Sequence, residues 1–289
     1  MKLPQLLQLF SLAALWGASF LFIKLAVPYF SPIPLTAVRS LVATITLMPI
    51  LLISGKWPEF KRNWPHIMVI GLISTAIPAT MLSISTQYTS AGFASILNAL
   101  TPLFSALVAW LWLKEALNVS TVAGISLGFI GVMVMVFDRQ TISANFVLLP
   151  IIAGVTGTFL YGLTGNYSRR FTQAVSPIVI SAGCQLFSAI FMLPVAFFLW
   201  PDTSIPAQGW IYAVILGVFC TGVAFILYFQ LLEKVGVVRT VVVTYLVPVF
   251  AMLWGTLFLA EVVTLKMLIG AALILAGVGL STKLAGLKS

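Results

Sequence analysis

The feature that most constrains this chain is a succession of apolar runs, each about 20 residues long, separated by short polar stretches. A helix of about 20 apolar residues crosses a membrane, whereas a barrel strand alternates polar and apolar residues over about ten positions. The runs here are continuous, and only 7% of the residues are charged, against roughly a quarter in soluble domains. We therefore predict ten transmembrane helices near residues 5–26, 33–53, 66–86, 91–113, 119–137, 147–168, 176–199, 208–231, 237–259 and 264–282.

The second half of the chain repeats the first. A shift of 146 positions aligns residues 64–133 with 210–279 without a gap, and a shift of 145 aligns the earlier part. Matches of Trp, Pro, Glu and Gly are informative because apolar matches arise easily by chance. The matched pairs include Gly17 with Gly162, Trp64 with Trp210, Gly71 with Gly217, Thr75 with Thr221, Pro102 with Pro248, Phe104 with Phe250, Glu115 with Glu261, Gly124 with Gly270, and Gly131 with Gly277.

An odd number of helices in each half gives the two halves opposite orientations. We place the first repeat at residues 1–140 and the second at residues 141–289, with five helices in each. Inverted repeats are common in transporters, where two conformations alternate around a site near the bilayer midplane. The predicted fold is an all-α integral membrane bundle of two inverted five-helix repeats. A duplicated helical scaffold or sensor without a transport role is the alternative.

The distribution of Lys and Arg predicts the orientation, since cytoplasmic loops carry an excess of positive charge. With a cytoplasmic N-terminus, three cations fall outside, namely Lys24, Arg139 and Lys266. Eleven fall inside, namely Lys2, Lys56, Lys61, Arg62, Lys114, Arg169, Arg170, Lys234, Arg239, Lys283 and Lys288. We therefore expect both termini in the cytoplasm, and these dispersed loop charges explain the net charge of +9 better than nucleic-acid binding does.

Two matched prolines lie near the middle of the fourth and ninth spans. Proline lacks an N–H and frees the carbonyl four residues earlier, so Pro102 and Pro248 are predicted to bend their helices beside Asn98 and Thr244. Ser95 extends the polar stripe on the fourth span. With opposite orientations, Asn98 and Thr244 bracket the midplane and are candidate substrate ligands. Close packing of helices through small residues is the equally open alternative.

Arg39 is a full charge well within a span, which is costly in lipid and usually marks a cavity or a bonded partner. It could instead extend to the outer membrane surface. If Arg39 contacts the substrate, an anionic group on that substrate is expected. Its counterpart in the second repeat is Cys184, so this feature is not symmetric.

Aromatic residues provide further candidate ligands. Trp16 and Tyr161 occupy matching positions in the first and sixth spans, where they could line a pocket, pack, or anchor at the interface. Tyr228 and Tyr245 are candidates on the same grounds.

The remaining paired residues have structural interpretations. Glu115 and Glu261, at opposite membrane faces, are expected to cap a helix or pair with a loop cation, and Lys24 to extend toward the outer surface. Glycines of the fifth and tenth spans are expected to mediate helix packing; they are Gly124, Gly128, Gly131, Gly270 and Gly277.

Motifs of enzymes and pumps are missing from the sequence. It contains no paired-histidine zinc motif, no phosphate-binding loop with a lysine and no plausible nucleophile–base pair. No Asp or Glu lies in the middle of a span, so no carboxylate proton relay is evident. We therefore expect no enzyme activity, no metal and no cofactor.

The doubled pattern resembles the EamA-type repeat of the drug/metabolite transporter superfamily. The run Leu15-Trp-Gly-Ala-Ser-Phe-Leu-Phe-Ile-Lys24, Arg39, and the stretch Tyr88-Thr-Ser-Ala-Gly-Phe-Ala carry the likeness in the first repeat, followed by Pro102, Glu115, Gly124 and Gly131. The second copy departs from it where Tyr161 replaces the tryptophan and Cys184 the arginine. It keeps Pro248, Glu261, Gly270 and Gly277.

The resemblance implies a ten-helix bundle whose central cavity is lined by the first, third, fourth, sixth, eighth and ninth spans. It also implies export of amino acids, metabolites or drugs across a bacterial inner membrane. The related small multidrug pumps use a glutamate in their first helix, which this chain lacks. The hypothesis is a secondary transporter or facilitator of small molecules that works by alternating access in the lipid bilayer, as a monomer or a homodimer.

Overall fold

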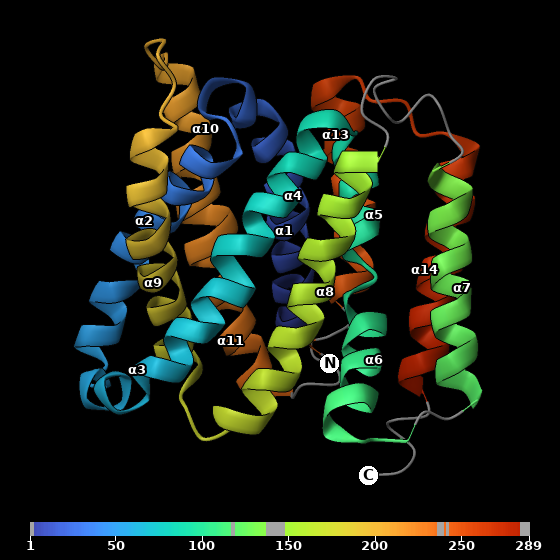
Figure 1. Cartoon of the computed structure of the whole chain (residues 1–289), viewed down its shortest axis with the longest axis horizontal. Helices are drawn as coiled ribbons and strands as arrows, with labels where there is room; N and C mark the ends of the chain where they lie inside the picture. Colours follow the sequence, from blue (N-terminus) through green and yellow to red (C-terminus); the bar gives the residue numbers. More distant parts are fainter. Residues whose placement is uncertain (1–2, 117–118, 137–147, 236–239, 241–242, 284–289) are drawn as a thin grey trace.

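The computed structural model describes residues 3–116, 119–136, 148–235, 240 and 243–283 (Figure 1). The regular elements in these residues are helices, because lipid offers no partner for backbone N–H and C=O groups and a helix satisfies both within one segment. They are α1 (Leu3–Phe30), α2 (Pro32–Ile53), α3 (Trp57–Gly71), η1 (Leu72–Ala76), α4 (Ile77–Tyr88), α5 (Ala91–Asn98), α6 (Thr101–Leu113), α7 (Val119–Val136), α8 (Leu148–Phe171), α9 (Pro177–Phe198), α10 (Ala207–Gly217), η2 (Val218–Val223), α11 (Ala224–Val235), α13 (Val243–Leu259) and α14 (Leu265–Lys283).

These elements form ten membrane spans. Seven apolar helical segments have at least 18 residues and three shorter apolar helices join them, so the described residues hold seven plus three, or ten, candidate spans. The prediction of ten transmembrane helices is confirmed. Three spans combine several elements, namely α3–η1–α4, α5–α6 and α10–η2–α11. Residues 237–239 and 241–242 of the predicted ninth span lie outside the described residues, as do Lys2, Arg139, Arg239 and Lys288.

The two repeats interlock across the bundle. Helix α2 packs against α9, and α7 packs against α14, and each pair consists of repeat-related spans. Helix α1 contacts α10, α11 and α13 of the second repeat, while α8 makes the matching contacts with α3, α4 and α6 of the first. Figure 1 shows α7 and α14 side by side at one edge of the bundle, with α2, α9 and α10 at the opposite edge. Each repeat therefore completes its packing with elements of the other.

Matched glycines bring these helices together. A Cβ added to Gly17 of α1 would lie 2.7 Å from the Phe250 Cβ of α13. A Cβ added to Gly162 of α8 would lie 2.7 Å from the backbone nitrogen of Ser105 in α6. The two contacts are related by the repeat, and any side chain at either position would force the helices apart.

Glycines also line the contact between α7 and α14. A Cβ at Gly131 would lie 2.7 Å from the Gly270 carbonyl oxygen, and Gly277 packs as closely on the Gly124 carbonyl. The predicted packing role of these four glycines is confirmed. Gly128 also mediates packing: it lies against Leu103 of α6, and its backbone nitrogen would lie 3.1 Å from a Cβ added to Gly277.

Pro102 and Pro248 have different effects in the two repeats. Helix α5 ends at Asn98 and α6 begins at Thr101, so the bend expected at Pro102 is a break. Pro102 has no N–H to donate to the Asn98 carbonyl, and the Thr101 hydroxyl donates to it instead, at 2.7 Å. Pro248 lies inside the continuous helix α13. The expectation of two equivalent bends is therefore wrong.

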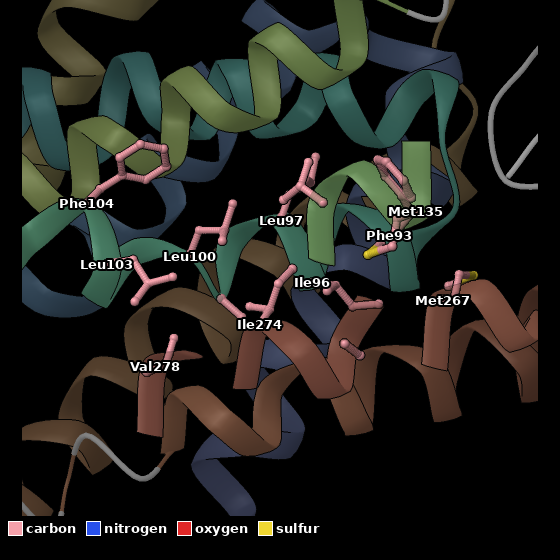
Figure 2. Close-up of a cluster of buried hydrophobic side chains, with 13 residues drawn as sticks. Phe93, Ile96, Leu97, Leu100, Leu103, Phe104, Met135, Met267, Ile274 and Val278 are labelled. Atoms are coloured by element: carbon pink, nitrogen blue, oxygen red, sulfur yellow. The ribbon is translucent and has the colours of Figure 1, made fainter. Parts of the chain in front are cut away.

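A buried apolar cluster holds the broken span in place (Figure 2). Ile96, Leu100 and Leu103 of the α5–α6 span pack with Ile274 and Val278 of α14. The side chains of Leu100 and Ile274 are 2% and 0% exposed, so the break is enclosed by protein and not by lipid. This enclosure is what a non-helical turn at membrane depth requires.

Candidate functional site

Arg39 reaches from α2 to the π-helical segment η2. Its Nε donates a hydrogen bond of 2.9 Å to the hydroxyl oxygen of Thr221, which is 1% exposed. The Thr221 hydroxyl in turn donates to the Leu216 carbonyl, five residues earlier, at 2.9 Å. Of the two interpretations of Arg39, the structure supports a bonded partner within the bundle and not an extension to the membrane surface.

The segments η1 and η2 lie at matching places in the two repeats. Leu72 and Val218, their first residues, differ by 218 − 72 = 146 positions, which is the offset of the repeat. A π-helical turn widens the helix and occurs often at functional sites. In η1, the Ser74 and Thr75 hydroxyls lie 3.2 Å apart. Sequence analysis did not predict either segment.

Paired glycines position both π-helical segments. A Cβ added to Gly71, just before η1, would lie 2.9 Å from the Cys184 carbonyl of α9. A Cβ added to Gly217, just before η2, would lie 3.1 Å from the Arg39 carbonyl of α2. Arg39 and Cys184 are repeat counterparts, so each π-helical segment packs on the same position of the partner helix. The matched glycines were the sequence signal for this contact.

Tyr161 of the second repeat lies near Arg39 of the first. Tyr161 of α8 and Cys220 of η2 lie within electrostatic range of the Arg39 guanidinium, and Ser19 of α1 interacts with Cys220. Tyr161 and Cys220 of the second repeat therefore lie near the charge of Arg39 in the first repeat. Among the predicted ligands, this arrangement brings Arg39 and Tyr161 together.

Trp16 packs against other aromatic rings. Its ring lies 5.5 Å from that of Tyr228 and 6.4 Å from that of Phe225, both in α11. Trp16 and Tyr228, both predicted as possible ligands, thus form one aromatic contact between α1 and α11.

Asn98 lies at the end of α5, beside the break. Its side-chain Oδ1 is buried and has no hydrogen-bond partner among the residues that the structure describes. Ser95, one turn earlier, is fully buried, and its hydroxyl donates to the Gly92 carbonyl of its own helix at 2.7 Å. Within this stripe, Asn98 is the residue with an unused acceptor.

Thr244 and Tyr245 are half-buried in the first turn of α13. Tyr245 packs against the buried cluster that contains Phe93 and Ile96 of α5. It therefore lies at the contact between the fourth and ninth spans.

Lys24 closes the end of α4. Its Nζ donates hydrogen bonds to the carbonyl oxygens of Thr86, Gln87 and Thr89, at 2.9, 3.1 and 2.6 Å. The last carbonyls of a helix have no partner within it and carry partial negative charge, so a lysine stabilises them. The expected extension of Lys24 to the outer surface is wrong, because these bare carbonyls lie within its reach.

Glu261, from the second repeat, caps the start of α5. Its Oε1 accepts from the backbone N–H of Ala91 at 2.8 Å, and its Oε2 accepts from that of Gly92 at 3.4 Å. The carboxylate thus satisfies the free N–H groups at the start of α5. Lys24 and Glu261 together hold the short α4–α5 connection, and we call them the Lys24–Glu261 clamp.

The opposite end of the bundle carries the repeat counterparts of this clamp. Glu115 is offset from Glu261 by 261 − 115 = 146 positions, and Arg169 from Lys24 by 169 − 24 = 145. Glu115 and Arg169 form a direct ion pair whose side chains are 46% and 51% exposed. The predicted capping or pairing roles of Glu115 and Glu261 are confirmed.

Matched turns present the two glutamates. Lys114 and Ala260 both have positive φ, of 60° and 54°, directly before Glu115 and Glu261. The backbone N–H of each glutamate donates to a carbonyl six residues earlier, a bond that closes the C-terminal turn of the helix. A left-handed conformation is unusual for residues other than glycine, so its presence in both repeats indicates a shared backbone.

Two hollows lie away from Arg39. One, of about 250 Å³, is bordered by Trp110 and Glu115 at the end of α6. The other, of about 470 Å³, is apolar and lies among α1, α10 and α13, next to Phe22 and Trp254. The central cavity remains a prediction. In the described part of the chain, no group of three His, Cys, Asp or Glu side chains is placed to hold a metal.

Comparison with known sequences decides the family. The EamA-like transporter family matches residues 3–137 and again residues 148–283, which together cover nearly the whole chain. The chain belongs to the EamA-like transporter family. A membership of this kind indicates a multi-pass membrane transporter and not an enzyme.

Relatives of this EamA-like transporter carry the same general description. An uncharacterized transporter of Archaeoglobus fulgidus is 27% identical over 267 residues, which cover 91% of this chain and 93% of the relative. The uncharacterized transporter YvbV of Bacillus subtilis is 24% identical, with 92% and 88% covered. The uncharacterized inner membrane transporter YedA of Escherichia coli is 26% identical, with 88% and 82% covered.

A solved crystal structure shares the fold of this EamA-like transporter. It matches with a TM-score of 0.69 and 22% sequence identity, and the match covers 100% of both chains.

Proposed function

We propose that the protein is a secondary transporter or facilitator that exports small molecules, namely amino acids, metabolites or drugs, across a bacterial inner membrane by alternating access. The observation that carries this proposal is the interlocked inverted repeat, in which α1 packs on α13 as α8 packs on α6. Two similar halves of opposite orientation can exchange conformations, which opens one site to each side in turn.

The proposed substrate site lies where the repeats meet. Arg39, Tyr161 and Thr221 come from α2, α8 and η2, and widened π-helical turns suit a region that rearranges. Asn98 adds a buried acceptor at the break between α5 and α6. Thr244 and Tyr245 line the neighbouring start of α13.

The ends of the bundle act as gates in this proposal. The Lys24–Glu261 clamp holds the α4–α5 connection closed through five hydrogen bonds, three from Lys24 and two to Glu261. The exposed Glu115–Arg169 pair occupies the matching position at the other end. In the other conformation, we expect the hydrogen bonds of the Lys24–Glu261 clamp to break and the α4–α5 connection to move.

Flux through liposomes tests the proposal. The purified protein is reconstituted, and labelled amino acids, organic acids and cationic drugs are tested against empty vesicles. We expect at least one compound to enter, and an unlabelled excess of it inside the vesicles to accelerate entry of the label. Such counterflow is a property of carriers. If no compound crosses faster than in empty vesicles, the scaffold or sensor alternative replaces the transporter.

A reporter fused after the last residue tests the orientation. We expect a reporter that is active only in the cytoplasm to be active, because both termini are proposed to lie there. A reporter active only outside the cell would reverse the topology.

A further inference from the structure

The positive charge of Arg39 has no carboxylate partner in the part of the chain that the structure describes. The ion pair found there is Arg169 with Glu115, at one end of the bundle. The carboxylates whose side chains are described lie at helix ends or in connections; they are Glu59, Glu115, Asp202 and Glu261. Glu59 is bonded to Ser176, and Glu261 to the start of α5. Among the described side chains, the guanidinium of Arg39 therefore has no anionic partner inside the bundle.

The partner that Arg39 does have is neutral and uses only part of the guanidinium. Thr221 accepts from Nε, while its own proton goes to the Leu216 carbonyl. The two Nη groups of Arg39 make no hydrogen bond to the described residues, and the side chain is half-buried and not sealed. The edge of the guanidinium that carries the two Nη groups is thus available to a ligand.

An uncompensated charge at this depth is costly, and a guanidinium fork matches a carboxylate through two parallel hydrogen bonds. We propose that Arg39 binds the single carboxylate of a small-molecule substrate. This inference rests on the proposed transport function. Thr221 holds the Nε side of the guanidinium, so that the Nη edge points to the substrate, beside Tyr161.

Charge balance selects one carboxylate over a phosphate. Arg39 is the cation that the structure describes within the interior of a span, apart from Lys24, which is bonded to three carbonyls at the end of α4, of Thr86, Gln87 and the following Thr89. A phosphate monoester carries about −1.5 to −2 charges at neutral pH, so one guanidinium would leave part of that charge uncompensated in a poorly solvated site. A single carboxylate balances the guanidinium and leaves no excess negative charge.

The two repeats differ at the position of Arg39, so the substrate would bind in one orientation. At the position that matches Arg39, the second repeat has Cys184, which lies next to Ser74 of η1. Of these two matching positions, the one at η2 therefore carries a positive charge and the one at η1 does not. Asn98 offers an unused acceptor elsewhere in the first repeat, which suits an ammonium or hydroxyl donor on the same substrate.

Ligand-induced stabilisation and flux test this inference together. The probes are the proteinogenic amino acids and common 2-oxo and 2-hydroxy monocarboxylates, with their amides, which lack the carboxylate, the corresponding amines and sugar phosphates. Each is tested for a rise in melting temperature of the full-length protein and for entry into liposomes. The variants are Arg39→Gln and Arg39→Lys, with Arg62→Gln as the matched control, because Arg62 is exposed on α3.

We expect monocarboxylates to give the largest stabilisation and their amides none. Arg39→Gln should lower carboxylate affinity at least about tenfold, Arg39→Lys should restore part of it, and Arg62→Gln should remain within about twofold of the unmodified protein. The melting temperature without ligand shows whether each variant is folded, and the lysine variant keeps the test decisive if the glutamine variant is not.

The outcomes separate the two proposals. If monocarboxylates stabilise the protein through Arg39 and nothing crosses the vesicles, the carboxylate site stands and transport fails. If amines or amides are carried and carboxylates are not, transport stands and the carboxylate site is wrong. The inference is also contradicted if no monocarboxylate shifts the melting temperature, or if Arg39→Gln binds carboxylates as well as the unmodified protein does.

Discussion

The segments η1 and η2 occupy matching places in the two repeats but face different side chains. At η2, Arg39 crosses from α2 to bond Thr221, whereas at η1 the equivalent position of α9 is Cys184. The backbone contact is the same in both, since Gly217 and Gly71 pack on the carbonyls of these two residues. Duplication has therefore preserved the packing, while the chemistry at the centre has diverged. The backbone contacts, which we call the symmetric frame, are therefore the same in both repeats, whereas the side chains of the proposed site are not.

The largest expected effect tests the symmetric frame. Gly17→Ala and Gly162→Ala should each lower the stability by about 2–3 kcal/mol, because the new Cβ meets the backbone or Cβ of a facing helix. Gly165→Ala is the control, since its Cβ would meet only the Ser105 Oγ at 3.7 Å. Thermal unfolding in detergent measures all three. If Gly17→Ala were as stable as the control, the close contact at Gly17 would not contribute to stability and the two repeats would not pack in the same way.

The next effect compares the polar residues beside the two prolines. Asn98→Leu should lower transport about 20-fold, and Thr244→Val about fivefold, since Asn98 holds the unused acceptor. Asn98→Leu should leave stability unchanged or raised, because it removes a buried polar group without a partner. Flux in liposomes and the melting temperature separate the two effects. Normal flux in both variants would remove these residues from the site.

A smaller effect compares the threonines of the two π-helical segments. Thr221→Val should weaken substrate binding about tenfold, because Arg39 loses the hydroxyl that holds its Nε. Thr75→Val, the matched change in η1, should alter binding less than about twofold, since no described arginine depends on it. Concentration dependence of flux measures both. Equal losses would show that the centre is symmetric after all.

The smallest effect compares the two ends. Lys24→Met should lower the stability by about 1–2 kcal/mol, because three carbonyls at the end of α4 lose a charged donor. Arg169→Met should cost less than about 1 kcal/mol, because an exposed ion pair contributes little. Thermal unfolding at low and high salt distinguishes them. A larger loss of stability for Arg169→Met than for Lys24→Met would contradict this prediction and show that the stronger contact is the Glu115–Arg169 pair.

The sequence by itself determined the ten spans, their two inverted repeats and several paired roles. Long apolar runs specify helices in lipid wherever they occur, because the backbone must bond within its own segment. A constant offset likewise assigned packing to Gly131 and Gly270, and capping or pairing to Glu115 and Glu261. These features depend on local composition or on comparing the chain with itself.

Only the tertiary structure decided how the polar groups are used. Lys24 has the same sequence context whether it extends to the membrane surface or caps α4, and its choice depends on carbonyls about sixty residues later in the chain. The break at Pro102, in contrast with the continuous helix at Pro248, depends on the Thr101 hydroxyl and on enclosure by α14. The direction of Arg39 depends on the widened turn of η2, 182 positions away. Apolar length is a property of each segment, whereas the partner of a buried polar group is set by what folding brings beside it.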